Sequence, residues 1–253
     1  GQSPVISISL KSMKQGSYKD AFHMFKVLIA REYDRHKVIL KSGKISDSER
    51  DLFHSILTQR AEDAFYLDSI KFLSDIMVKY YNKNVIILID EYDVPLENAF
   101  HQGFYTDMVN LIRSVFESAL KTNPSLDRAF LTGCLRVSKE SIFTGLNNLQ
   151  IFSIMSTKFD DSFGFTQEEI NVMLECYDLT DKSSDIAHWY DGYKFNDVDI
   201  YNPWSVLNYL SEAAEKSSAL CKPYWSNTSS NEIVKRLIEE SNDRTKNAIE
   251  ELI

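Results

Sequence analysis

The sequence predicts an α/β fold, in which a mostly parallel sheet with flanking helices is followed by a helical region. Val85–Ile89 is an apolar, mostly β-branched run, as in a strand buried within a parallel sheet. Strand-like segments alternate with amphipathic segments of about twenty residues, a spacing typical of βαβ units. Beyond Phe159 helix signals dominate, beginning with the capping-box sequence Thr166–Glu169. We therefore divide the chain into a core, residues 1–158, and a helical region, residues 159–253.

Four segments are predicted as strands. Val5–Leu10 alternates apolar residues with serine, which indicates a strand with one less buried face, near a sheet edge. Val85–Asp90 is the second strand, Arg128–Cys134 the third and Ile151–Ile154 the fourth. The first strand begins within a few residues of Gly1, which suggests that the sequence is a piece of a longer protein.

Helices are predicted where apolar residues recur every three or four positions. Ser17–Tyr33, Ala61–Tyr81 and Phe104–Leu120 carry such a stripe. Lys41–Arg50 is polar and loop-like, and Asp47 or Ser48 could cap a helix there.

The composition argues against several classes of protein. With 43% apolar residues the chain can form a sizeable core, and a net charge of −9 is unlike the basic surface of a nucleic-acid clamp.

The three cysteines, Cys134, Cys176 and Cys221, have no spacing typical of disulfide frameworks or zinc sites, and they fit a reducing cytoplasm. No apolar run approaches the roughly 18 residues of a membrane span. We expect a cytoplasmic location and no membrane partner.

The carboxylates of Asp90 and Glu91 follow directly on the second strand. Ligands of parallel sheets bind at the carboxyl ends of the strands, so both side chains are expected at a site. An Asp-Glu pair in this position is typical of a Walker B element. Asp90 would hold Mg²⁺, and Glu91 would polarise the attacking water. Asp93 is interpreted as a turn residue.

The phosphate-binding loop that normally accompanies such a pair, G-x-x-x-x-G-K-[ST], is absent from the sequence. It needs two glycines five positions apart, and the closest two of the eight glycines, Gly133 and Gly145, are twelve apart. Gly43-Lys44 lacks the rest of the motif and is interpreted as a surface loop. Residues 1–253 therefore lack the usual means of binding a triphosphate.

Several motifs together resemble the AAA-ATPase-like proteins of bacteria, a group of P-loop NTPases often fused to a C-terminal restriction-endonuclease-like nuclease domain. They occur in the order of that family and span nearly the whole chain. The matching segments are Ile87–Leu96, Leu131–Phe143, Gly145–Leu149, Phe163–Thr166, Trp189–Tyr193, Tyr201–Ser205 and Tyr224–Ser229.

The resemblance implies a P-loop NTPase sheet of the AAA+/STAND type that lacks its Walker A segment, followed by a helical lid. It implies ATP and Mg²⁺ as cofactors of the intact protein, an ATP-dependent molecular switch, with residues 1–253 inactive as an ATPase by themselves. The implied partners are the nucleotide, a protein partner or a second copy, and nucleic acid through a fused nuclease domain.

The end of the third strand supplies candidate sensors of the γ-phosphate. Thr132 has a hydroxyl, and Arg136 a permanent charge whose planar fork suits phosphate. Lys139 is a further candidate. The alternatives are a surface ion pair for Arg136 and a solvated side chain for Lys139.

Two other functions remain open. The chain could be a non-enzymatic protein-interaction module on an ATPase fold that has lost its phosphate loop. It could also be a metal-dependent nuclease centred on Asp90, Glu91 and Asp93. The acidic net charge, and the lack of a lysine beside those acids in the sequence, argue against the nuclease.

Two structural expectations follow. Trp189, Tyr193, Trp204 and Trp225 are expected to be buried in the helical region. The resemblance also places a Walker A strand between Arg128–Cys134 and Ile151–Ile154. Either these two strands pair directly or another segment lies between them, and we favour an upstream segment.

Overall fold

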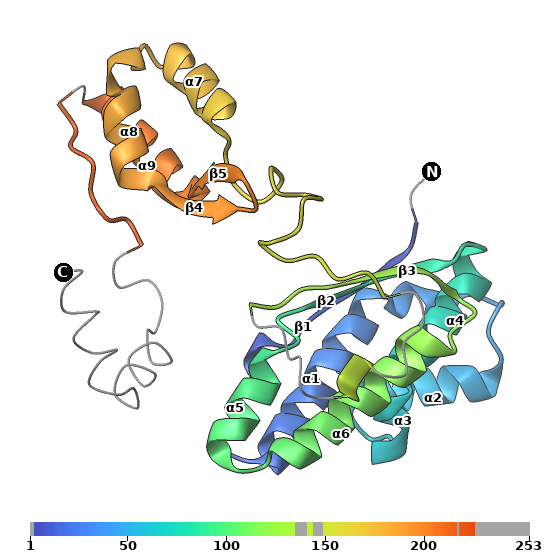
Figure 1. Cartoon of the computed structure of the whole chain (residues 1–253). Coiled ribbons are helices and arrows are strands. Elements are labelled where there is room, and N and C mark those ends of the chain that lie inside the picture. The colour runs from blue at the N-terminus through green and yellow to red at the C-terminus, as the bar shows by residue number, and fades with distance from the viewer. Residues whose placement is uncertain (1–2, 135–140, 144–148, 217, 226–253) are drawn as a thin grey trace. The chain divides into compact units, whose positions relative to one another are not determined.

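The computed structural model describes residues 3–134, 141–143, 149–216 and 218–225. The chain forms two compact units, residues 1–149 and 150–253 (Figure 1). Each unit is described separately below.

The first unit contains the parallel sheet. Its strands are β1 (Val5–Ser9), β2 (Val85–Asp90) and β3 (Leu126–Leu131), in the order β1-β2-β3. The first three predicted strands are thereby confirmed, with β1 at an edge and β2 in the centre. The α/β class predicted from the sequence is correct.

Helices fill the connections between these strands. They are α1 (Tyr18–Arg35), α2 (Asp47–Leu57), α3 (Asp63–Leu67), α4 (Ser69–Tyr81), α5 (Val94–Gln102) and α6 (Tyr105–Phe116). The 3₁₀ turns are η1 (Lys11–Met13), η2 (Lys37–Lys41) and η4 (Ser141–Phe143), and a π-helical turn, η3 (Glu117–Lys121), extends α6. The helix predicted over Ala61–Tyr81 is divided at Asp68. A helix does begin within the polar segment Lys41–Arg50, but its cap is Ser46 and not Asp47 or Ser48.

The two faces of the sheet are covered differently. Figure 1 shows α1, α4 and α6 on one side of the sheet, where Ile8 and Ile89 line a small apolar cavity with Phe25 of α1, Ile70 of α4 and Ile112 of α6. On the opposite face the coverage is thinner. Ile86 and Leu88 of β2 are partly exposed there, and their neighbours in β3, Arg128 and Phe130, are exposed.

The two edges of the sheet also differ. Along β1, the buried carboxylate of Glu32 in α1 accepts a hydrogen bond from the backbone N–H of Ser7, at 2.9 Å. Arg35 donates to the same carboxylate at 2.6 Å, and His36 lies 3.2 Å from it. Along β3, no strand of the described part of the chain pairs with the outer edge. One edge is therefore occupied by a side chain, while the other is open to a further strand.

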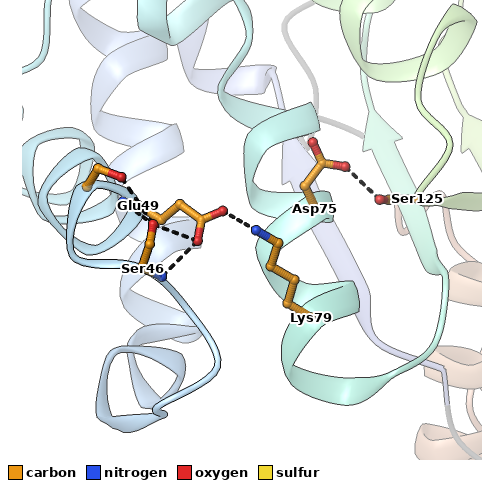
Figure 2. Close-up of polar contacts among 6 residues, drawn as sticks. Ser46, Glu49, Asp75, Lys79 and Ser125 are labelled. Carbon is orange, nitrogen blue, oxygen red and sulfur yellow. Dashed lines mark hydrogen bonds and ion pairs between the residues drawn. The ribbon is translucent and has the colours of Figure 1, made fainter.

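Polar contacts connect α4 to α2 and to the residue just before β3 (Figure 2). Ser46 and Glu49 form a reciprocal capping box at the start of α2, and Glu49 also receives a hydrogen bond from Lys79 of α4. Asp75 of α4 accepts a 2.6 Å hydrogen bond from the hydroxyl of Ser125, immediately before β3. α4 is thus held to both α2 and the amino end of β3.

The second unit combines helices with a small hairpin. Its elements are α7 (Gln167–Cys176), η5 (Thr180–Lys182), α8 (Ser183–Tyr190), β4 (Asp191–Phe195), β5 (Val198–Tyr201) and α9 (Pro203–Glu215). The capping box at Thr166 is confirmed, whereas the antiparallel β4–β5 hairpin was not predicted.

Within the described parts of both units, no helix has both the length and the apolar character needed to cross a membrane.

Two predictions for the second unit are wrong. Ile151–Ile154 is not a strand, and its side chains are exposed. The four aromatic side chains expected in the core are each about half exposed, between 49% and 53%. These are Trp189, Tyr193, Trp204 and Trp225. The aromatic part of the core is formed instead by Tyr190, Tyr201 and Tyr209, each at most 4% exposed.

Candidate functional site

The carboxyl ends of all three strands are joined by backbone hydrogen bonds. The N–H of Leu10, just after β1, donates to the carbonyl of Asp90 at 2.9 Å. The N–H of Thr132, just after β3, donates to the carbonyl of Ile89, also at 2.9 Å, and Thr132 in turn accepts from Tyr92 N–H at 3.1 Å. The polar residues after the strands therefore meet at one edge of the sheet, as expected of a parallel α/β fold.

Asp90 and Thr132, two residues predicted separately, are in direct contact. The hydroxyl of Thr132 donates a hydrogen bond to Oδ1 of Asp90. The contact follows from the parallel register, in which Ile89 lies beside Leu131 and the next residues on both strands therefore point to the same face. Both side chains are exposed to solvent.

Glu91 has an unusual backbone conformation. Its φ of +54° lies in the left-handed region, which non-glycine residues seldom adopt and which costs of order 1–3 kcal/mol. Its Oε1 lies 3.9 Å from Nζ of Lys11, in the turn after β1. Its Oε2 is buried and has no hydrogen-bond partner among the described residues. Strain and an unsatisfied buried carboxylate oxygen in one residue are typical of functional sites rather than of ordinary turns.

The turn that follows is tightly packed. Asp93 precedes α5, as expected of a turn residue, but it is only 2% exposed. A Cβ atom built on Gly133 would lie 2.6 Å from Oδ1 of Asp93 and 2.9 Å from Cε1 of Tyr92. The Tyr92 ring packs edge-on against Phe143, with ring centroids 5.4 Å apart. Glycine at position 133 thus allows β3 and the Glu91–Asp93 turn to approach closely.

Several carboxylates gather around the site. Partial burial raises the pKa of the Cys134 thiol, and the nearby carboxylates of Asp93, Glu91, Asp90 and Glu97 raise it further. Such a cluster repels phosphate groups unless cations lie between them. A ligand with phosphates would therefore need a metal ion or added basic side chains here.

The side chains present suit Mg²⁺ held jointly with a ligand better than a metal held by protein alone. Within the described residues, no three His, Cys, Asp or Glu side chains gather closely enough to hold a metal ion. Asp90 offers one accessible carboxylate, with the Thr132 hydroxyl beside it. Mg²⁺ is commonly bound in this way, through one or two carboxylates, water and the phosphates of a substrate.

Two predicted residues, Arg136 and Lys139, lie outside the described residues. One residue beside the site, Lys11, was missed by sequence reasoning, because it reaches Glu91 across neighbouring strands and lies eighty positions away in the chain. Its position corrects one argument against a nuclease, since a lysine does lie beside the acids in space.

Comparison with known proteins identifies similar chains. Residues 1–143 match a family model described as AAA-ATPase-like, predicted AAA-ATPase. An uncharacterised protein encoded in the 5′ region of vnfD in Azotobacter chroococcum mcd 1 is 28% identical over 147 residues. The match covers 58% of this chain and 27% of that protein, so the chain spans about a quarter of its relative's length. No solved structure matches the chain.

Proposed function

Because this chain belongs to the AAA-ATPase-like family, we propose that it is part of an ATP-dependent molecular switch whose Walker B element is the end of β2. The observation that carries the proposal is the arrangement at that strand end. Asp90 is hydrogen-bonded to Thr132, and the strained Glu91 follows it with one buried oxygen unsatisfied.

The two acids have separate roles in this proposal. Asp90 would hold Mg²⁺ together with the nucleotide phosphates, and Thr132 would fix the orientation of the Asp90 carboxylate. Glu91 would accept a proton from the attacking water. It follows Asp90 directly in the chain, its Oε1 lies 3.9 Å from Lys11, and its Oε2 has no hydrogen-bond partner among the described residues. Mg²⁺, when bound, would neutralise part of the phosphate charge that this acidic edge otherwise repels.

We propose that Arg136 and Lys139 contribute positive charge toward the γ-phosphate. Both follow Thr132 in the chain within a few residues, and the described part of the site has an excess of carboxylates that such side chains would offset.

The missing phosphate-binding loop would come from a strand–loop–helix segment outside this sequence. Two features of the described residues support this: β3 has an open outer edge, and Phe130 beside it is 55% exposed. Parallel sheets are normally covered on both faces. A strand paired with β3, followed by a helix over Leu88 and Phe130, would satisfy the edge and cover the face together.

The second unit would act as the lid in this proposal, as expected for residues 159–253. Nucleotide would move it only by making different contacts in two states of the protein. The half-exposed aromatic side chains of that unit leave apolar surface available for such contacts.

A hydrolysis assay tests the proposal. The product of the complete reading frame should hydrolyse ATP with Mg²⁺, and Glu91→Gln should reduce kcat by roughly 10²-fold or more, the usual contribution of a general base. Residues 1–253 alone should show little turnover. Asp127→Asn is the matched control, because it removes one exposed carboxylate at the opposite end of the sheet and should leave kcat unchanged.

Turnover that survives Glu91→Gln would refute the assignment of the base. Robust turnover by residues 1–253 that disappears in Glu91→Gln would refute the need for an external phosphate loop. If the complete product lacks G-x-x-x-x-G-K-[ST] and binds no nucleotide, the interaction-module alternative is the better account.

A further inference from the structure

The turn after β1 places a lysine beside the proposed catalytic base. Lys11 is the first residue of η1, and the backbone of the preceding Leu10 is hydrogen-bonded to Asp90. Nζ of Lys11 lies 3.9 Å from Oε1 of Glu91, although the Lys11 side chain is 79% exposed. The β1–β2 pairing thus fixes where the Lys11 side chain begins, close to the end of β2.

The two oxygens of Glu91 have different surroundings. Oε1 faces the lysine, whereas Oε2 is buried without a hydrogen-bond partner among the described residues. The left-handed backbone fixes where the Glu91 side chain begins, but its side-chain torsions remain to be fixed by contacts. An ion pair at Oε1 restricts these torsions and keeps Oε1 toward solvent while Oε2 stays buried.

We propose that Lys11 is a positioning residue for the base. Its ion pair would hold Oε1 of Glu91, the less buried of the two oxygens, on the solvent side, where Oε1 can accept a proton from the attacking water. This inference rests on the proposed function, in which Glu91 accepts a proton from that water. The triads of other enzymes use the same principle, in which a third group orients the base. Lys11 itself transfers no proton in this arrangement.

The test uses steady-state ATP hydrolysis by the complete protein. Lys11→Met should lower kcat by about two- to fivefold, the effect of losing one exposed ion pair, with KM for ATP unchanged. Lys11→Arg should restore kcat, and Lys11→Glu should lower it further than Lys11→Met, because like charges repel. Lys37→Met is the matched control, since it breaks a comparable exposed ion pair with Asp34 far along the chain and should change neither parameter.

The outcomes separate this inference from the proposed function. If Glu91→Gln abolishes turnover and Lys11→Met leaves kcat unchanged, the role of Lys11 is wrong and that of Glu91 stands. A raised KM with unchanged kcat in Lys11→Met also overturns the inference, because it assigns the lysine to nucleotide binding. Wild-type protein without turnover, or turnover insensitive to Glu91→Gln, refutes both.

Discussion

The hydroxyl of Thr132 is hydrogen-bonded to the carboxylate of Asp90, joining the ends of two neighbouring parallel strands. Thr132→Val keeps the shape of the side chain and removes the donor. In the complete protein we expect it to weaken Mg²⁺-dependent nucleotide binding by roughly tenfold, since a hydrogen bond to a charged group contributes about 1.5–3 kcal/mol when it is well formed. Thr132→Ser should retain binding, and calorimetry with and without Mg²⁺ measures both.

Thr58→Val is the control for this change, because the Thr58 hydroxyl donates only to the backbone of α2, at 2.8 Å from the carbonyl oxygen of His54. Equal loss of affinity in Thr132→Val and Thr132→Ser would contradict a role for the hydrogen bond.

Gly133→Ala should destabilise the first unit. The new methyl group would lie 2.6 Å from Oδ1 of the buried Asp93, so either β3 or the Glu91–Asp93 turn must move. Overpacking of this kind costs about 1–3 kcal/mol and is measurable as a lower midpoint of thermal unfolding. Gly16→Ala has no atom within 4 Å of the added methyl group and should be neutral or slightly stabilising. Equal midpoints for both variants would show that the close packing around Gly133 is absent in solution.

The Glu32 carboxylate should make the stability of the first unit depend on pH. Burial raises its pKa, but hydrogen bonds from His36, Ser7 and Arg35 outweigh that effect, so the net pKa lies below 4.5. The folded state therefore gains stability from the ionised carboxylate at pH values above the unfolded pKa, and it loses that contribution as the pH falls through the folded pKa.

Glu32→Gln should accordingly be less stable than wild type near pH 7 by roughly 1–3 kcal/mol. The difference should shrink as the pH falls from about 5 toward 3. Denaturant unfolding across this range checks both statements, and a difference that is independent of pH would show that the charge of Glu32 is not involved.

The sequence predicted the part of the fold in which local pattern and tertiary environment agree. Strands β1, β2 and β3 have clear period-two or continuous apolar patterns, and all three are present. Ile151–Ile154 has a similar apolar pattern, but four residues without a partner strand do not form a sheet. The β4 sequence, Asp191–Phe195, alternates only over Tyr193 and Phe195, too short a pattern to predict a strand, and the strand is formed by pairing with β5. Such pairing is not visible in a local pattern.

The candidate site was predicted only where its residues follow the strands. Asp90, Glu91 and Thr132 could be identified from strand ends, but their mutual contacts depend on register. Lys11 lies in a short polar turn whose sequence gives no sign of the acids beside it.

Tyr209 and Trp204, both in α9, should respond differently to truncation. Tyr209 is 1% exposed and belongs to the core, whereas Trp204 is 53% exposed. We expect Tyr209→Ala to destabilise the second unit by about 3–5 kcal/mol and Trp204→Ala to have a much smaller effect. Thermal unfolding followed by circular dichroism tests the contrast. A loss for Trp204→Ala as large as that for Tyr209→Ala would mean that the Trp204 side chain is covered in solution.

The outer edge of β3 offers a direct test of the missing strand. Because the Thr132 N–H points to β2, alternation along the strand turns the N–H groups of Ala129 and Leu131 outward. These two amides should exchange rapidly with deuterium in residues 1–253 and slowly in the complete protein, while the Phe130 amide is protected in both. Slow exchange of Ala129 and Leu131 in residues 1–253 would show that another segment already covers this edge.

The central claim is that the end of β2 is a Mg²⁺–nucleotide site that needs a phosphate-binding loop from outside this sequence. The most direct measurement is calorimetric titration of ATP, with and without Mg²⁺, into the complete protein and into residues 1–253. The complete protein carrying Glu91→Gln should bind ATP in the presence of Mg²⁺, and Asp90→Asn should remove the Mg²⁺ dependence, whereas residues 1–253 should give no measurable heat of binding. Tight binding by residues 1–253, or Mg²⁺ dependence that survives Asp90→Asn, would contradict the claim.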